Sequence, residues 1–137
     1  MTDEPITFVG TEAANARIAQ LHARYGVDRY MEMDRRIKVL SDWLDSANAH
    51  RDPEARTWGR LAKLAEESGE VVEAYIGFTG QNPRKGNTHL LGDVLKELMD
   101  VALTALQAYH HLTQGNVSTM AELEAHMLYQ LQRVGLE

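Results

Sequence analysis

The fold is decided by two acidic stretches, Glu66-Glu67-Ser68-Gly69-Glu70 and Glu97-Leu98-Met99-Asp100. Both contain acids three residues apart, and on an α-helix this spacing places two side chains on one face about one turn apart. Two such helices packed face to face would gather four carboxylates in a small volume. Anions in dry surroundings need a cation between them, and oxygen ligands suit Mg²⁺ or Mn²⁺. The sequence therefore predicts a divalent-metal site for a phosphorylated substrate.

The composition indicates one acidic domain. A chain of 137 residues is most simply a single domain, 1–137, and is long enough to bury a hydrophobic core. Fourteen basic and 20 acidic residues give a net charge of 14 − 20 = −6, and no basic stripe follows the chain, so a polynucleotide partner is disfavoured. Cysteine is absent, which excludes disulfides and thiolate metal sites.

The first residues predict a cytoplasmic protein. Met1-Thr2-Asp3-Glu4 is acidic, and no long apolar run follows it. We therefore expect neither a signal peptide nor a membrane span, and no membrane partner.

Apolar residues at helical spacing predict an all-α bundle of about four to five helices. Asp52-Pro53-Glu54 is typical of a helix start, with an N-cap, a proline at the first helical position and an acid in the first turn. Glycine, proline and asparagine concentrate at residues 80–87 and predict a loop there. The expected helices span residues 11–25, 28–49, 53–78, 90–113 and 118–134.

The expected helix at 91–111 has an unusual distribution of side chains. Apolar residues cover well over half of its circumference, so we expect it to be largely buried. Asp100 is the only formally charged residue from Leu98 to Tyr109, and a desolvated carboxylate needs a metal, a cationic side chain or water. The remaining polar stripe is narrow and consists of Asp93, Glu97, Asp100, Thr104, Gln107 and His111.

This pattern, Glu-Glu-x-x-Glu followed by a spacer and Glu-x-x-Asp, resembles the signature of the all-α nucleoside triphosphate pyrophosphohydrolases, the MazG-like superfamily. The resemblance covers a motif-bearing core at about residues 35–113, and leaves out 1–27 and the C-terminal helix at 118–137. It implies Mg²⁺-dependent hydrolysis of a nucleoside triphosphate, NTP or dNTP, to the monophosphate and pyrophosphate. It also implies a homodimer or homotetramer in which helices from two subunits complete the bundle.

The resemblance assigns roles to individual positions. Glu67, Glu70, Glu97 and Asp100 correspond to metal ligands, and Glu66 and Glu67 to catalytic positions. Glu66, as the carboxylate least committed to metal, is expected to accept the proton of the attacking water. Candidate substrate contacts reach the phosphates, read a base edge or stack on the base, and are Lys63, Asn82, Arg84, Lys85, Gln107 and Tyr75. For Lys63, an ion pair with the neighbouring acids is the competing interpretation.

Two other functions fit the same residues. A single-substrate relative, such as a dUTPase, a dCTP pyrophosphatase or a phosphoribosyl-ATP pyrophosphohydrolase, would use the same chemistry. A non-catalytic helical oligomer could retain the acids and act as a binding or scaffold protein. Nucleotide turnover separates the enzymes from the scaffold.

Overall fold

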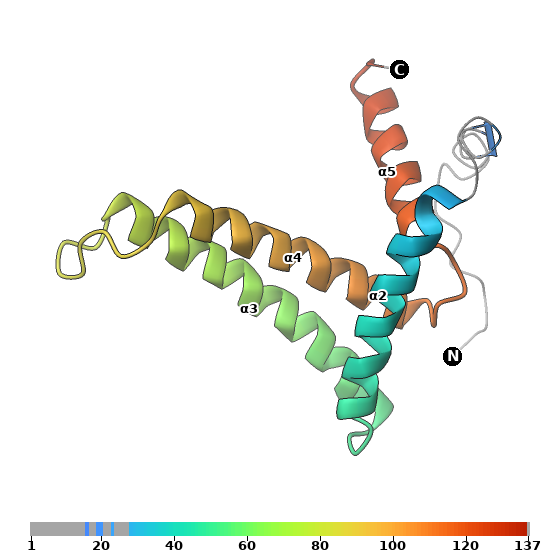
Figure 1. Cartoon of the computed structure of the whole chain (residues 1–137), viewed down its shortest axis with the longest axis horizontal. Coiled ribbons are helices and arrows are strands. Elements are labelled where there is room, and N and C mark those ends of the chain that lie inside the picture. Colours follow the sequence, from blue (N-terminus) through green and yellow to red (C-terminus); the bar gives the residue numbers. More distant parts are fainter. Residues whose placement is uncertain (1–15, 17–18, 21–22, 24–27, 137) are drawn as a thin grey trace. The chain divides into compact units, whose positions relative to one another are not determined.

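The computed structural model describes residues 16, 19–20, 23 and 28–136, and this part of the chain is all-α, as predicted (Figure 1). It contains no strand in the described ranges. The expected helix boundaries are correct to within two residues, while the helix expected at 11–25 lies largely outside the described residues. The four helices are α2 (Asp28–Ala47), α3 (Pro53–Thr79), α4 (Leu91–Leu112) and α5 (Thr119–Arg133).

The contacts divide the chain into two compact units. Ile37–Gly115 forms one unit and contains the end of α2, all of α3 and all of α4. The other contains the start of α2 together with α5, whose N-cap Ser118 donates a hydrogen bond to Asp34. The prediction of one domain over 1–137 stays a prediction. Both acidic stretches lie in Ile37–Gly115, so this unit holds the candidate site.

Local signals mark both ends of α3 and the start of α4. The Asp52 side chain accepts from the Ala55 N–H at 2.9 Å, and Gly80, at φ 64°, ends α3 in the left-handed conformation that glycine favours. At the start of α4, the Asp93 carboxylate accepts from the Leu90 N–H at 2.7 Å. These caps satisfy backbone groups that a helix end leaves without partners.

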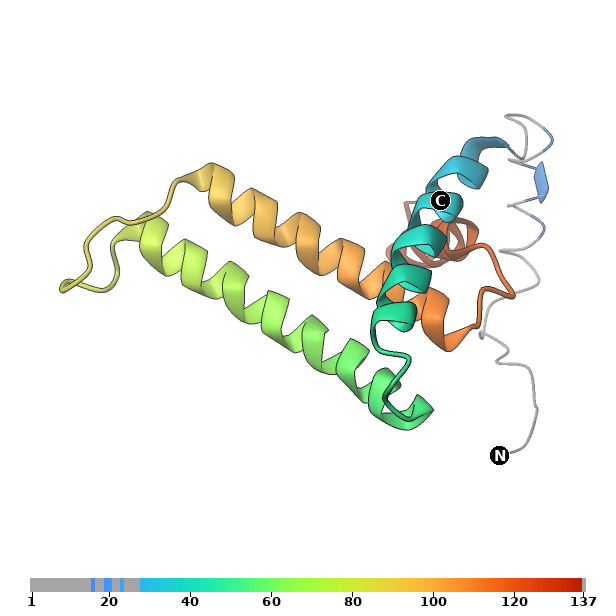
Figure 2. The ribbon, with the colours of Figure 1, turned by 60° about the horizontal axis from the view of Figure 1, so that its bottom comes forward.

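Helices α3 and α4 form an antiparallel hairpin and lie side by side in both views (Figures 1 and 2). The loop between them is tied back to α3, because Asn87 Nδ2 donates to Phe78 O at 2.6 Å and the Thr88 N–H donates to Gly77 O at 2.9 Å. Gly77 permits this close approach, since a Cβ atom there would lie 2.1 Å from His89 Nδ1. The loop thus fixes where α4 starts against α3.

A polar network joins the opposite end of the hairpin to α2. Arg60 Nη2 donates to Ser41 O at 2.7 Å and to Asp45 Oδ1 at 2.9 Å. The second carboxylate oxygen of Asp45 is 3.1 Å from His111 Nδ1, and His111 Nε2 is 3.0 Å from Thr57 Oγ1. Because the Arg60 side chain is only 10% exposed, little water reaches its guanidinium group, and these acceptors must stabilise its positive charge. The network therefore links α2, α3 and α4 through one shared carboxylate.

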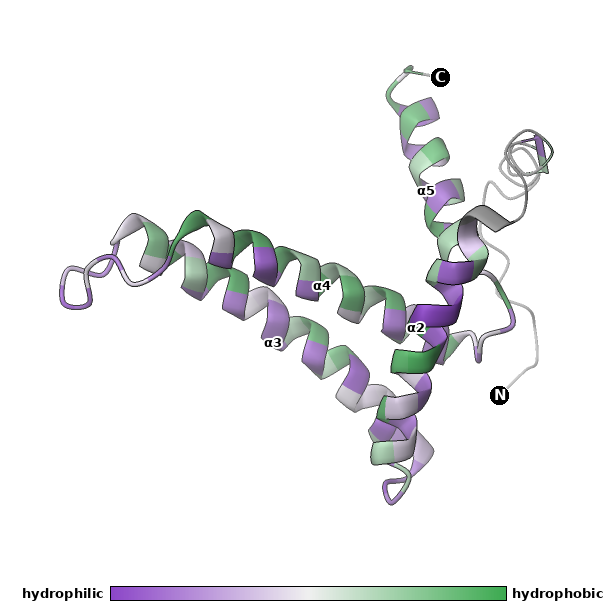
Figure 3. Cartoon of the chain, in the orientation of Figure 1, coloured by the Kyte–Doolittle hydropathy of each residue, from purple (hydrophilic) through white to green (hydrophobic). Residues whose placement is uncertain are grey.

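The expectation that α4 is largely buried is wrong for the single chain. Val94 and Ala108 are buried, but a stripe of large apolar side chains remains 37–67% exposed. Hydrophobic residues are visible along α4 in Figure 3. The physical reason is that α3 covers only one side of α4, and nothing in the described part of the chain covers this stripe. The stripe consists of Leu91, Leu95, Leu98, Met99 and Leu103.

None of the helices in the described part of the chain combines the length and the apolar character needed to span a bilayer.

We predict that Asp45→Asn lowers the free energy of unfolding by about 1–3 kcal/mol, because it removes the charged acceptor from a part-buried arginine. Asp42→Asn is the matched control, since Asp42 pairs with Lys38 on an exposed surface and its loss should cost less than about 1 kcal/mol. Urea denaturation at neutral pH measures both values. Equal losses for the two variants would contradict the role assigned to the network.

The same network has a defined pH dependence. Burial alone would raise the pKa of Asp45, but the hydrogen bonds from Arg60 and His111 outweigh burial and hold that pKa below its usual value of 3.8. The stability that Asp45 contributes is therefore fully present above its usual pKa of 3.8. It is lost as the pH falls through the lower pKa that Asp45 has in the folded chain. The difference between the wild type and Asp45→Asn should shrink on acidification, and denaturation curves at several acidic pH values measure it.

Candidate metal centre

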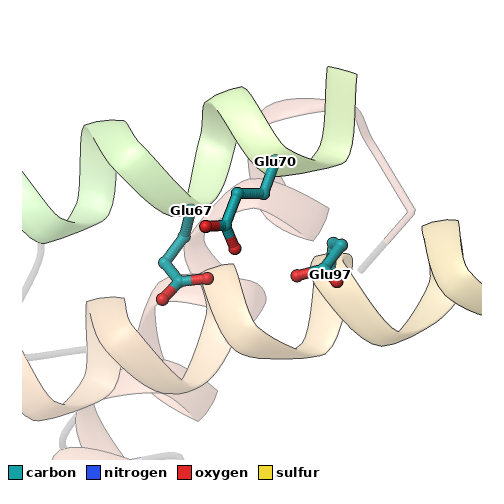
Figure 4. A group of neighbouring side chains, drawn as sticks. All are labelled: Glu67, Glu70 and Glu97. Carbon is teal, nitrogen blue, oxygen red and sulfur yellow. The ribbon is translucent and has the colours of Figure 1, made fainter. Parts of the chain in front are cut away.

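Three carboxylates converge between α3 and α4. One oxygen each of Glu67, Glu70 and Glu97 can be chosen so that all three atoms lie within 4.8 Å of one another. The three side chains point into the space between the two helices (Figure 4). Glu67 is only 8% exposed, and Glu70 and Glu97 are partly exposed. The two acidic stretches are therefore brought together, as the sequence predicted, and we call these three residues the carboxylate cluster.

Helix geometry explains how α3 supplies two of the three. Residues three apart on a helix differ by about 60° around the axis, so Glu67 and Glu70 share the face that meets α4. Buried small residues of α3, Ala74 and Gly77, lie further along the helix. Val94, one turn before Glu97, is the corresponding buried residue of α4.

Asp100 lies outside the carboxylate cluster, although the sequence predicted it as the fourth ligand. Its Oδ2 atom is 2.8 Å from Lys96 Nζ on its own helix, and its side chain is more exposed than that of Glu97. Aspartate is one methylene shorter than glutamate, so its carboxylate reaches less far toward α3. The described residues thus form a group of three acids, with Asp100 beside it.

Two lysines form ion pairs with four of the five acids in the two acidic stretches, and only Glu70 is left out. Lys63 Nζ lies 2.8 Å from Glu67 Oε1 and 3.1 Å from Glu66 Oε2. Lys96 Nζ lies 3.0 Å from Glu97 Oε1, in addition to its contact with Asp100. These hydrogen bonds raise the pKa of both ammonium groups, so the lysines stay charged.

Glu70 is the acid of the cluster that has no ion pair among the described residues. The negative charge of Glu67, followed by burial, raises the pKa of the Glu70 carboxyl above its usual value of 4.5, and the charge of Glu97 adds to this. A raised pKa means that the folded chain resists ionisation of this group. The raised pKa of Glu70 therefore reflects repulsion from Glu67 and Glu97, which a bound cation would relieve.

The residues present fit a hard divalent cation. Adjacent ligands of Mg²⁺ lie about 3 Å apart and opposite ligands about 4.2 Å, since each bond is about 2.1 Å long. The cluster, at no more than 4.8 Å, needs only a small contraction to reach these separations. Glu97 Oε2 is in addition buried with no hydrogen-bond partner among the described residues, a costly state for a carboxylate oxygen. All donors are oxygens, which favours Mg²⁺ or Mn²⁺ over softer metals without selecting between them.

Most of the predicted substrate residues lie elsewhere in the hairpin. Arg84 and Lys85 follow the end of α3, and Thr79, nine positions after Glu70, already lies about 14 Å along the helix from it. The Asn82 side chain shapes the loop, because its Oδ1 accepts from the Arg84 N–H at 3.1 Å. The structure therefore does not bring this loop to the carboxylate cluster.

The two remaining candidates also lie away from the cluster. Tyr75 is about 140° around α3 from Glu70 and is exposed, with its ring 6.3 Å from that of Phe78. Gln107 lies ten residues beyond Glu97, about 15 Å along α4. Its backbone carbonyl oxygen is 3.5 Å from Ser41 Oγ. Of the predicted substrate residues, only Lys63 touches the cluster.

Sequence reasoning passed over two features of this unit. No role is assigned to Lys96 from the sequence, although its spacing of four residues before Asp100 is the signal for an ion pair on one helix face. No pattern in the sequence indicates the contact of His111 with Asp45, because the two residues are 66 positions apart and only the fold brings them together.

No protein-family model, no curated protein and no solved structure matches this chain.

We predict that Glu70→Gln stabilises the metal-free protein and removes most of its stabilisation by Mg²⁺. Because the folded-state pKa is raised, ionised Glu70 destabilises the fold, and this effect grows as the pH rises through that pKa. The gain from Glu70→Gln should therefore be present at neutral pH and disappear at acidic pH. Thermal unfolding with a chelator and with Mg²⁺ measures both effects.

The control is Glu73→Gln, which makes the same charge change at an exposed position one turn further along α3. It should leave the Mg²⁺ response unchanged. A Glu70→Gln protein that is less stable than the wild type without metal, at neutral pH, would contradict the repulsion argument.

Proposed function

We propose that this chain is a Mg²⁺-dependent nucleoside triphosphate pyrophosphohydrolase that converts an NTP or dNTP to the monophosphate and pyrophosphate. The observation that carries the proposal is the convergence of Glu67, Glu70 and Glu97, from both acidic stretches, on one small volume. The resemblance of the two stretches to the MazG-like signature supports the choice of reaction. The net charge of −6 agrees with a protein that needs metal to bind an anionic substrate.

The cluster residues have distinct roles in this proposal. A divalent ion bound there supplies charge neutralisation for the phosphate oxygens and an activated water. Glu67, Glu70 and Glu97 would hold the ion, and Asp100 stays a predicted fourth ligand because it lies next to Glu97 on α4. Glu66 is exposed and outside the cluster, so it is the carboxylate left to accept a proton from water.

We further propose that the exposed apolar stripe of α4 pairs with a second copy of the chain. Leu91, Leu95 and Met99 recur at intervals of four residues, the spacing with which one helix packs against another. The stripe contains no charged side chain, so two identical copies meet there without like-charge repulsion. A two-fold contact needs only one such self-complementary surface. This arrangement agrees with the homodimer or homotetramer that the resemblance implies.

Turnover tests the enzymatic proposal directly. Wild-type protein should release pyrophosphate from at least one member of a panel of ribo- and deoxyribonucleoside triphosphates, and only with Mg²⁺ or Mn²⁺ present. Glu70→Gln and Glu97→Gln should each lower this rate by at least about 100-fold, because even groups that only orient metal ligands contribute about 10- to 100-fold. Circular dichroism should show an unchanged helical fold.

Glu73→Gln again serves as the control and should retain wild-type turnover. Full activity in Glu70→Gln and Glu97→Gln would exclude the carboxylate cluster as the reaction centre. A wild-type protein that binds Mg²⁺ but turns over no nucleotide would favour the scaffold alternative.

Sedimentation tests the proposed pairing. Met99→Glu places a charge in the middle of the α4 stripe and should convert the assembly to monomers, because burying an unpaired carboxylate costs several kcal/mol. Met127→Glu makes the same change at an exposed methionine of α5 and should leave the mass unchanged. A wild-type chain that sediments as a monomer at all concentrations would contradict the pairing.

A further inference from the structure

Each half of the site contains one lysine, Lys63 on α3 and Lys96 on α4, that pairs with acids of its own helix. Lys63 stands four residues before Glu67 on α3, and Lys96 stands four residues before Asp100 on α4. Each ammonium group bridges two acids of its own helix, at distances between 2.8 and 3.1 Å. Each half of the acidic site therefore carries its own internal cation.

These lysines contact oxygens that belong to the candidate ligands. Lys63 uses Glu67 Oε1, and Lys96 uses Glu97 Oε1. Glu70 has no ion pair among the described residues, and Glu97 Oε2 is buried without a partner. The Glu70 carboxylate and Glu97 Oε2 are thus open to an incoming ion. Lys63 and Lys96 each occupy one other oxygen of the candidate ligands.

Charge explains why lysine and metal compete. Glu66, Glu67, Glu70, Glu97 and Asp100 carry five negative charges and the two lysines carry two positive charges, so the group has a net charge of −5 + 2 = −3. A divalent ion reduces this excess but then lies among ammonium groups that repel it. Each lysine is easily moved, because its side chain is 47% (Lys63) or 66% (Lys96) exposed and exposed ion pairs are weak.

We propose that Lys63 and Lys96 are exchangeable counter-ions of the metal centre: they neutralise the acids in the metal-free chain and leave their glutamate oxygens when a divalent ion binds. This inference rests on the proposed metal site and adds to it a control of metal affinity. The two lysines lower the affinity for the ion and limit charge repulsion when the ion is absent. Metal binding therefore releases two ammonium groups beside the site.

A simple helix-stabilising role predicts a different behaviour. In that case the lysines would keep their contacts when metal binds, as exposed pairs four residues apart on a helix do. Lys38 with Asp42 on α2 is such a pair, at 2.6 Å and outside the site. It provides an internal standard for a lysine that pairs with an acid but has no part in metal binding.

The experiment is acetylation of the intact protein, followed by mass spectrometry of its peptides. The sequence contains only four lysines, Lys38, Lys63, Lys85 and Lys96, so each can be followed separately. Adding Mg²⁺ should increase the acetylation rates of Lys63 and Lys96 several-fold, because an amine that has left its two carboxylate partners is more open to the reagent than one held between them. The rates of Lys38, paired with Asp42, and of Lys85, in the loop, should stay unchanged.

Glu70→Gln is the matched negative control. It removes a candidate metal ligand but touches neither lysine, so the ion pairs should persist and Mg²⁺ should no longer change the labelling of Lys63 or Lys96. In a second measurement, Lys63→Gln and Lys96→Gln should each tighten Mn²⁺ binding by about two- to five-fold, as expected for loss of one competing exposed ion pair. Lys38→Gln should leave that affinity unchanged. Calorimetric titration with Mn²⁺ measures these dissociation constants.

The outcomes separate this inference from the enzymatic proposal. If Mg²⁺ binds and nucleotide turns over, but the labelling of Lys63 and Lys96 does not change, the counter-ion exchange is refuted and the enzyme assignment stands. If labelling changes with Mg²⁺ but no nucleotide is hydrolysed, the exchange stands and the enzyme assignment fails. A wild-type protein that binds neither Mg²⁺ nor Mn²⁺ refutes both.

Discussion

Repulsion among carboxylates between two packed helices is the constraint on which the candidate site depends. Glu67, Glu70 and Glu97 face one another across the hairpin, and helix packing holds them closer than free carboxylates would stay. The chain offsets this repulsion from within through Lys63 and Lys96. The offset is incomplete, because Glu70 forms no ion pair with any described residue and its pKa is raised. The cation of the proposed metal centre would relieve this residual repulsion.

Much of the helical organisation could be predicted from the sequence, because local signals determine it. Asp52 and Pro53 mark the start of α3, Gly80 marks its end, and the loop composition separates α3 from α4. Helix periodicity also placed Glu67 and Glu70 on one face and therefore predicted the meeting with Glu97. These inferences need only the geometry of a single helix and the assumption that two acidic faces meet.

The parts that could not be predicted depend on tertiary contacts. Side-chain reach and the ion pair with Lys96 keep Asp100 outside the cluster, and neither follows from a spacing of three residues. The position of the loop residues Asn82, Arg84 and Lys85 depends on the length of α3 beyond Glu70. The network of Asp45 and His111 joins residues far apart in the chain, so only the folded arrangement reveals it. The exposed stripe of α4 shows the same limit, since its apolar composition indicates a buried helix and the single chain leaves the stripe exposed.

If Glu70 is a ligand of the proposed metal centre, its position sets stability and metal binding against each other. A neutral side chain there would remove repulsion from the folded chain and, with it, a ligand that the proposed centre requires. Laboratory selection for heat resistance alone would therefore enrich replacements of Glu70 and yield robust proteins with an impaired metal centre. Retention of the acid through many generations of random mutation would, by the same reasoning, require selection for what the centre does, because selection for folding alone would act against it.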